Sequence, residues 1–404
     1  MATILKIPDK QSKGIIVFTD IERDNLLKDR IQKIKLLKRN WILGLHHNYW
    51  YDFKFKYNPL YDFSIATKDD LKEINDIKFP MFEASVVNFN KDNFWKFNKE
   101  NKHWDVLNIA RNMKFKKNEE FIKVIRELYN KNIKIRVLMI TYRDPDKKFK
   151  TRSLNDFYLE NFNDSERQLF NLIQLDTLSP PFDFETLSFF YSNSKLFCST
   201  SDVEHRPRLH SYAISSGIPI VVSKSISTLF PEKLRKEPGV FVAKTISEFS
   251  SQIIKALSYV NSAAYSKRSM QSFIDHFSNN VTINRFKEFI LKNFNIELNS
   301  SKNTNFKNLD LRLARHLGFN DHLISGIPIN IDAFLDLILQ DNHEQLLSLI
   351  KSNDLERELS NTGILSSDNL MVKKPIINRI RSFLIENNLD KYPRKIQKYF
   401  DLKI

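Results

Sequence analysis

Cysteine and glycine are scarce in this chain of 404 residues, which contains one cysteine and seven glycines. A single thiol, Cys198, excludes an intramolecular disulfide, and the sequence shows no cluster of Cys and His with the spacing of a metal site. Because Cys198 lies in a short apolar run, we expect it to be a small buried side chain. The composition therefore points away from disulfide-stapled and zinc-dependent scaffolds.

Long apolar runs are missing as well. No segment approaches the roughly 20 consecutive apolar residues of a membrane-spanning helix, and the start, MATILKIPDKQSKG, lacks the apolar core of a secretion signal. These absences lead us to expect a cytoplasmic protein. With 42% hydrophobic residues, the chain can still build ordinary cores for two or three domains.

Acidic residues are outnumbered, since 63 Lys and Arg against 48 Asp and Glu give a net charge of +15. Positive charge favours acidic partners such as nucleotides, anionic lipid surfaces and nucleic acids. The stretch 26–41, LLKDRIQKIKLLKRNW, is basic and amphipathic and is compatible with peripheral contact to an anionic membrane. A surface helix of a Rossmann-like domain explains it equally well. We do not expect nucleic acid to be the partner, because no recognised motif supports it.

The most informative segment is 201–222, SDVEHRPRLHSYAISSGIPIVV. Pro207 suits the first position of a helix, and Gly217 is a natural left-handed stop after it. Residues 218–222 are β-branched and apolar enough for a buried strand. The pattern predicts loop, helix and strand in that order.

Charge is concentrated at the start of this predicted helix. The loop carries the acid Glu204, and a basic cluster of Arg206, Arg208 and His210 lies beside it. A loop that feeds a helix N-terminus exposes unpaired N–H groups and the positive end of the helix dipole. The arrangement suits a phosphate-bearing ligand.

The same segment resembles the donor motif of the retaining glycosyltransferases of the GT-B fold, a large group that uses nucleotide-activated sugars. In that family the first acid of the motif sits at the donor sugar, and a second glutamate eight residues later holds the ribose hydroxyls. Tyr212 stands in the second position and offers only a phenol hydroxyl, and His205 replaces the usual glycine. The matching positions are Ser201, Glu204, Ala213, Gly217, Pro219 and Val221.

A second match lies upstream, where Arg111 and Lys116 follow the apolar stretch 104–110. The family has Gly-Arg, a short loop and Lys-Gly here, and its Arg and Lys grip the donor diphosphate. Ala110 and Lys117 replace the two glycines, so we expect a stiffer loop.

The resemblance implies an α/β, GT-B-like fold with two Rossmann-like domains and a C-terminal helical extension. We expect a shortened acceptor-side domain at 1–98, a donor domain at 99–295, a linker at 296–308 and the helical extension at 309–404. By this resemblance we expect the N-terminal domain to be incomplete, because the first βαβ units of the family have no counterpart. In it we expect strands at 14–18, 41–45, 62–67 and 84–90 and a helix at 25–39. The donor domain should contain helices at 119–131, 184–192, 207–216, 245–260 and 272–294, and strands at 133–140, 195–198 and 218–222.

His46 ends the predicted strand 41–45 on the acceptor side of the cleft. It could orient an acceptor hydroxyl or carry a proton, or it could be a packed histidine. Asp144 and Asp146 imitate a metal-binding Asp-x-Asp pair, but such Asp-Pro-Asp turns are common for structural reasons. We expect no metal there.

The function implied by the resemblance is transfer of a sugar from a nucleotide-diphosphate sugar to a hydroxyl of a glycan or lipid-linked acceptor. Transfer would proceed with retention and without a metal or other cofactor, since side chains and a helix N-terminus would neutralise the departing diphosphate. Two alternatives stay open: a glycosyltransferase-like binding or scaffold protein without activity, and a basic nucleic-acid-binding protein. The predicted site residues are Glu204 and His46 for catalysis, Arg111 and Lys116 for the diphosphate, and Ser201, His205, Arg206, Arg208 and Tyr212 for the rest of the donor.

Overall fold

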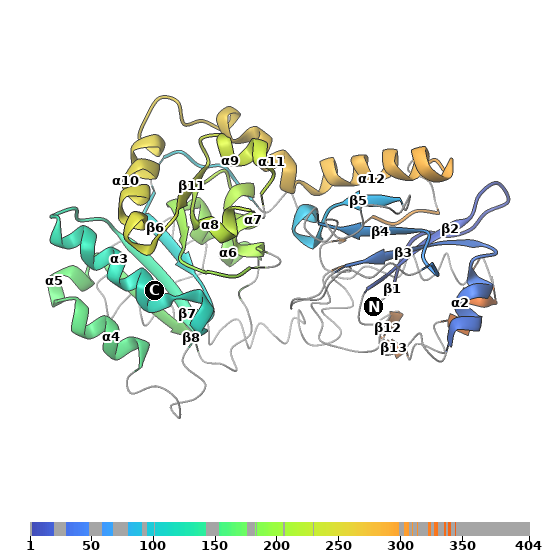
Figure 1. Cartoon of the computed structure of the whole chain (residues 1–404), viewed down its shortest axis with the longest axis horizontal. Coiled ribbons are helices and arrows are strands. Elements are labelled where there is room, and N and C mark those ends of the chain that lie inside the picture. The colour runs from blue at the N-terminus through green and yellow to red at the C-terminus, as the bar shows by residue number, and fades with distance from the viewer. Residues whose placement is uncertain are drawn as a thin grey trace, which may run out of the picture.

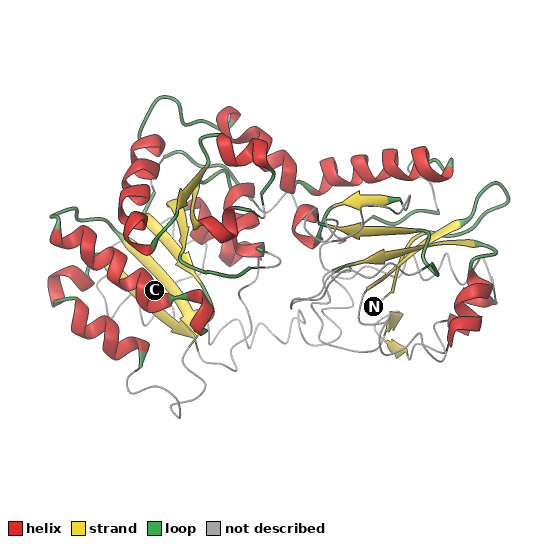
Figure 2. Cartoon of the chain, viewed as in Figure 1, coloured by secondary structure: helices red, strands yellow, loops and turns green. Residues whose placement is uncertain are grey.

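The protein has an α/β fold with two separate sheets, seen side by side in the computed structural model (Figure 1 and Figure 2). The structure describes residues 2–19, 30–47, 59–67, 80–90, 95–100, 102–142, 153–175, 182, 184–204, 207–228 and 230–298. It also describes 303–306, 309, 313, 322–324, 327–329, 335–336, 338–340 and 344. The predicted α/β class with two Rossmann-like sheets is confirmed.

The N-terminal sheet has five strands in the order in which they occur along the chain. β1 is antiparallel to β2, and the next three pairings are parallel. Every residue of β3 and β4 is buried, as expected for parallel strands covered on both faces. Within the described residues each strand is added on the same side, so this sheet has no point where the order reverses. The strands are β1 Ala2–Lys6, β2 Gly14–Thr19, β3 Trp41–His46, β4 Phe63–Ala66 and β5 Met81–Glu83.

The strand expected at 84–90 is wrong. The sheet ends earlier with β5, and Val86–Phe89 form the 3-10 helix η2. The physical reason is a local capping box, in which the side chain of Asn88 accepts a hydrogen bond from the backbone N–H of Ser85 at 2.9 Å. This closes a turn where an extended strand was expected.

The second sheet has six parallel strands in the order β11-β10-β9-β6-β7-β8. This is the doubly wound Rossmann order, with the direction of winding reversed between β6 and β9. In such sheets ligands bind beyond the carboxyl ends of the strands at this switch point. The strands are β6 Trp104–Ile109, β7 Val137–Tyr142, β8 Phe170–Leu175, β9 Ser194–Ser199, β10 Ile220–Ser223 and β11 Val240–Ala243.

Helices cover both faces of the second sheet, and alternate residues of each strand point to opposite faces. In β9, Leu196 and Cys198 pack with α3, α4 and α10, whereas Phe197 packs with α6, α7 and α11. Cys198 is fully buried, as predicted. The helices are α3 Asn118–Asn130, α4 Leu154–Asn161, α5 Asp164–Arg167, α6 Phe184–Ser192, α7 Arg208–Ser215, α8 Lys224–Ser227, α9 Glu232–Lys236, α10 Phe249–Val260 and α11 Gln271–Phe277.

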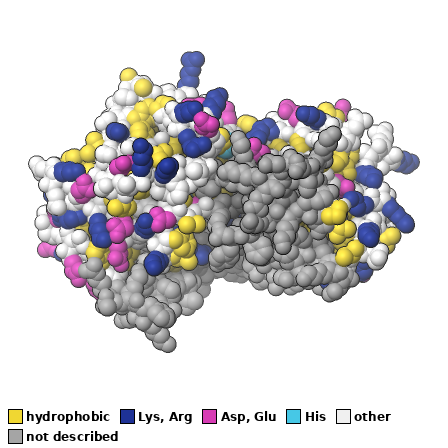
Figure 3. Space-filling model, viewed as in Figure 1, with side chains coloured by type: hydrophobic (Ala, Val, Ile, Leu, Met, Phe, Trp, Pro, Cys, Tyr) yellow, Lys and Arg dark blue, Asp and Glu magenta, His cyan; other side chains and the backbone are white. Residues whose placement is uncertain are grey.

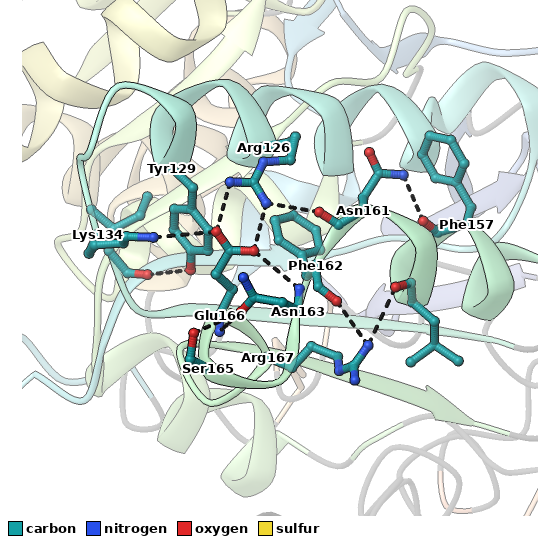
Figure 4. Close-up of polar contacts among 12 residues, drawn as sticks. Arg126, Tyr129, Lys134, Phe157, Asn161, Phe162, Asn163, Ser165, Glu166 and Arg167 are labelled. Atoms are coloured by element: carbon teal, nitrogen blue, oxygen red, sulfur yellow. Dashed lines mark hydrogen bonds and ion pairs between the residues drawn. The ribbon is translucent and has the colours of Figure 1, made fainter.

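Ionic contacts to the buried carboxylate of Glu166 link α3 to α5 (Figure 4). The guanidinium of Arg126 donates two hydrogen bonds to Glu166, at 2.6 and 2.7 Å, and Lys134 adds a third at 3.3 Å. The bond from Arg126 is the main cause that lowers the pKa of Glu166 to about 2. The carboxylate is therefore charged at neutral pH, although its side chain is only 6% exposed.

The two sheets are joined where the chain crosses between them twice. The backbone N–H of Asn90 donates to the carbonyl of Phe277 at 3.2 Å, and that of Asn279 donates to the carbonyl of Asn90 at 3.1 Å. The predicted helix 272–294 is interrupted here, because Ser278 adopts an extended conformation and caps α12, Asn279–Phe294. Figure 1 shows α12 lying over β4 and β5 of the N-terminal sheet.

The other face of the N-terminal sheet is covered by α2, Ile31–Leu37, and by pieces of the C-terminal region. Ile34 of α2 is buried with Leu335 and Ile338, and Lys33 forms an ion pair with Asp336 at 2.6 Å. Residues 25–29 of the helix predicted at 25–39 lie outside the described residues. α2 thus buries one face against the N-terminal sheet and the C-terminal region.

Two described segments lie in the regions expected to be a linker and a helical extension. Residues 303–305, predicted as linker, run beside β1, where Ile7 N–H donates to the Asn303 carbonyl at 3.0 Å and Asn305 N–H to the Leu5 carbonyl at 2.9 Å. The region predicted to be helical contains a hairpin of β12, His322–Ile324, and β13, Ile327–Ile329. The edge strand β1 offers backbone groups with which 303–305 pair, whereas β12 and β13 pair with each other as a separate two-stranded sheet, and composition alone reveals neither pairing. Most of 309–404 lies outside the described residues.

Candidate functional site

The candidate site lies at the switch point, where the loops after β6 and β9 meet. The β6 loop contains the 3-10 helix η3, Lys114–Lys116, and ends at Lys117 in the left-handed conformation with φ 53°. The resemblance places a glycine at this position. Lys117 therefore adopts the left-handed backbone conformation that glycine favours, although it has a side chain.

The two loops are fastened to each other by short polar contacts. The hydroxyl of Thr200 lies 3.0 Å from the carbonyl of Lys117, and the backbone N–H of Asp202 donates to the carbonyl of Phe115 at 2.9 Å. Ser201 is buried, and its hydroxyl lies 3.4 Å from the same Phe115 carbonyl. Ser201 thus helps to position the β6 loop.

The fastened loops bring together two predicted site residues. The Nζ of Lys116 donates to Oε1 of Glu204 in an ion pair whose side chains are 14% and 16% exposed. A second pair runs beside it, with Lys117 Nζ 2.6 Å from Asp202 Oδ2, and its side chains are 36% and 47% exposed. The first pair is shielded and the second is largely solvated.

The N-terminus of α7 begins just after the β9 loop. Pro207 precedes the helix, and the first turn of α7 contains no acid, whereas that of α3 carries Glu119 and Glu120. The first N–H groups of α7 therefore lack a nearby carboxylate from their own helix. They present a partial positive charge at the end of the β9 loop.

His210 lies in the first turn of α7 and is 2% exposed. Its ring packs edge-on against Phe197 of β9, with centroids 5.2 Å apart. Within the described part of the chain, neither ring nitrogen has a hydrogen-bond partner. Burial lowers the pKa of His210 to about 4. The sequence interpretation counted His210 in a basic cluster, but burial keeps the imidazole neutral at neutral pH.

Tyr212 occupies the position of the family's second glutamate, and its side chain is built into an aromatic cluster. Its ring stacks on Trp95 with centroids 4.5 Å apart and an interplanar angle of 15°. Phe184 meets it edge-on at 5.7 Å. Trp95 belongs to the segment between the two sheets, so Tyr212 also ties α7 to that segment. Packing is its evident role.

The remaining predicted donor residues are less constrained. Arg111 is exposed, and its backbone carbonyl accepts from the side chain of Asn118 at 3.3 Å, which anchors the start of the β6 loop. Arg208 is half-buried as the first residue of α7. His205 and Arg206 lie outside the described residues.

His46 ends β3 in the other sheet and is fully buried. Its Nδ1 lies 3.1 Å from the backbone carbonyl of Leu313. Because a carbonyl only accepts, Nδ1 carries the proton in this contact. The structure therefore places His46 beneath a C-terminal residue, whereas Lys116 and Glu204 lie at the second sheet.

Metal-ligating side chains do not gather in the described ranges, where no group of three or more His, Cys, Asp or Glu could hold an ion. Asp144 and Asp146 fall outside those ranges. Among the helices that the structure describes, none has both the length and the apolarity to cross a bilayer. On the face shown in Figure 3, Lys and Arg side chains are scattered over both lobes and are interspersed with acids.

No family model and no curated protein matches the chain. Solved structures do resemble it. The crystal structure of the GtfA/B complex is 11% identical over 67% of this chain and 56% of that one, with a TM-score of 0.48. A Glycosylation Associate Protein (Gap123) complex from Streptococcus agalactiae is 18% identical over 69% and 54%, with a TM-score of 0.47. An alpha-glucosyltransferase in complex with UDP-glucose and DNA containing an abasic site is 11% identical over 68% and 80%, with a TM-score of 0.46.

The chain thus spans only 56% of the GtfA/B chain and 54% of the Gap123 chain that it resembles. Because these structures are less than 20% identical to the chain, the comparison describes its fold and does not establish its activity.

Proposed function

We propose that this chain is a glycosyltransferase that binds a nucleotide-diphosphate sugar at the switch point between β6 and β9. The observation that carries the proposal is the meeting of Lys116 and Glu204 across that point, on two loops that are fastened to each other. Doubly wound sheets bind nucleotides at this place. A cation for phosphate and an acid for sugar hydroxyls are the two groups that such a donor requires.

The proposed roles follow from the charges that develop during transfer. As the bond between the sugar and the diphosphate breaks, negative charge grows on the diphosphate, and Lys116, Arg111 and the N-terminus of α7 stabilise it. Glu204 binds hydroxyls of the donor sugar and stabilises the positive charge that develops near the anomeric carbon. Catalysis is electrostatic and positional, and no metal is needed to neutralise the leaving group.

The acceptor in this proposal is a hydroxyl of a glycan or lipid-linked molecule, and transfer retains the anomeric configuration, as the resemblance implies. His46 is the candidate to orient that hydroxyl. Because His46 is buried next to Leu313, this role requires the C-terminal segment to move. A further proposal is that the protein contacts an anionic membrane peripherally, because Lys and Arg side chains on its surface would be attracted to the lipid headgroups.

The test is a turnover assay with UDP-, GDP-, ADP- and CDP-sugars. We expect Glu204→Ala and Arg111→Ala to abolish donor hydrolysis and transfer while the protein stays folded. Glu232→Ala and Arg268→Ala change exposed residues of helical segments outside the β6 and β9 loops, and these charge-matched controls should keep wild-type rates. Unchanged turnover in both site variants would contradict the assignment.

Tyr212 favours a second candidate, a glycosyltransferase-like binding or scaffold protein without activity. In the resemblance, a carboxylate at this position holds the ribose, whereas here an aromatic ring packs against Trp95. A folded protein that no nucleotide diphosphate stabilises in a thermal-shift panel would support this second candidate over the first.

A further inference from the structure

In the ligand-free site, the cation and the acid neutralise each other. Lys116 comes from the β6 loop and Glu204 from the β9 loop, and both side chains are more than four-fifths buried. The carboxylate of Glu204 thus occupies the place on Lys116 that a phosphate would take. Any anionic ligand has to displace it.

When a ligand displaces Glu204 from Lys116, the free-energy cost to the released carboxylate depends on what the ligand offers it. A bare nucleoside diphosphate would take Lys116 and separate Glu204 from the cation with which the structure pairs it, beside a new negative charge. Burial keeps His210, in the first turn of α7, neutral, so this imidazole supplies no compensating charge. A buried carboxylate without a partner is costly.

A sugar nucleotide avoids this cost. Its diphosphate takes Lys116, and its sugar hydroxyls donate hydrogen bonds to the carboxylate that has been released. Hydrogen bonds to a charged acceptor are stronger than those between neutral groups. The same two residues therefore favour a ligand that carries an anion and hydroxyl donors side by side.

We infer that the Lys116–Glu204 pair makes the site selective for the intact sugar nucleotide over the nucleoside diphosphate that remains after transfer. This inference rests on the proposed function. Once the sugar has left, Glu204 has no hydroxyl to hold and returns to Lys116, which expels the spent diphosphate. The pair is a specificity-determining and product-releasing contact in addition to its role in binding.

The neighbouring pair provides a matched control. Lys117 and Asp202 have the same chemistry and come from the same two loops, but their side chains are 36% and 47% exposed. Water can solvate Asp202 when Lys117 moves, so losing this pair carries little penalty. Asp202→Asn should therefore leave the selectivity of the site unchanged.

The experiment measures dissociation constants by calorimetry for four pairs of probes: UDP-glucose and UDP, GDP-mannose and GDP, ADP-glucose and ADP, and CDP-glucose and CDP. For the pair that binds, wild type should prefer the sugar nucleotide by about tenfold or more. Glu204→Gln should bind the bare diphosphate about tenfold more tightly than wild type does, which removes the preference. Lys116→Met should weaken both ligands, and Asp202→Asn should behave as wild type.

Equal binding of both ligands by wild type, or no gain for the diphosphate in Glu204→Gln, would overturn the inference and leave the proposed function standing. A wild-type protein that binds none of the eight probes would overturn the proposed function itself. Melting temperatures of the ligand-free variants confirm that each one is folded.

Discussion

Lys116 donates a hydrogen bond to Glu204 although 88 residues separate them along the chain. The contact joins the loop that follows the first strand of the Rossmann sheet to the loop that follows its fourth. In a doubly wound sheet these two strands are neighbours, and the winding reverses between them. The topology alone thus brings a cation and an acid to the place where nucleotides bind.

The left-handed conformation of Lys117 gives a prediction about stability. With φ 53° and ψ 45°, a residue with a side chain is strained there, and glycine is not. We expect Lys117→Gly to be more stable than Lys117→Ala by about 1 kcal/mol in urea denaturation. The control is the same two substitutions at Lys123 inside α3, where alanine should be the more stable by a similar amount. An alanine at residue 117 as stable as the glycine would contradict the account of this loop.

Tyr212 should be a packing residue. We expect Tyr212→Ala to lose about 3–5 kcal/mol in the free energy of unfolding, because it empties the space between Trp95 and Phe184. Tyr212→Phe keeps the ring and should lose no more than about 1.5 kcal/mol. If Tyr212→Phe weakened nucleotide binding without loss of stability, the hydroxyl would be a ligand contact and the packing account would be incomplete.

Local patterns were read correctly where local physics decides the structure. The helix predicted at 184–192 is α6 with the same bounds, and Gly217 adopts the left-handed conformation, with φ 72°, after α7. β8 and β11, the two edge strands of the second sheet, were not predicted, because a strand is defined by pairing with neighbours that lie elsewhere in the sequence.

In the candidate site, too, the sequence predicts individual residues but not the long-range contacts between them. The resemblance identified Lys116 and Glu204 as members of one site, but sequence spacing does not reveal that they pair with each other. Nor does it reveal the stacking of Tyr212 on Trp95, because that contact depends on where the chain crosses between the sheets. The neutrality of His210 follows from burial, which a short motif does not show.

Glu166 should make stability depend on pH in the acid range. Its pKa is lowered from 4.5 to about 2, chiefly by the hydrogen bond from Arg126. The unfolded chain therefore takes up the proton first, so the stabilisation is complete above pH 4.5 and is lost as pH falls toward 2. Between pH 7 and pH 3, wild type should lose about 2 kcal/mol more than Glu166→Gln does.

The control for Glu166 is Asp164→Asn, since the side chain of Asp164 in the same helix is 93% exposed. This variant should follow the wild-type pH profile. Equal pH dependence of wild type and Glu166→Gln, measured by chemical denaturation at each pH, would show that the ion pair is not formed.

His210 should stay neutral at pH values well below the ordinary pKa of histidine. Burial lowers its pKa from 6.5 to about 4, while the charge of Glu204 raises it and that of Lys116 lowers it. Because the unfolded state binds the proton first, stability should fall as pH drops from 6.5 toward 4, and His210→Asn should remove that part of the slope.

The direct measurement is the NMR titration of the His210 imidazole in histidine-labelled protein. We expect no titration above about pH 5, and a higher pKa in Lys116→Met, because that variant removes the positive charge that disfavours protonation. A midpoint near 6.5 would mean that the ring is solvated and not packed against Phe197.

The most direct test of the donor site is the melting temperature of the wild-type protein with UDP-, GDP-, ADP- and CDP-sugars, compared with Lys116→Met and with Lys123→Met as a surface control. The account predicts that sugars of at least one nucleotide stabilise wild type and Lys123→Met, and that Lys116→Met loses about tenfold or more in affinity. A folded wild-type protein that none of these donors stabilises, or a Lys116→Met variant that binds them as tightly as wild type, would contradict it.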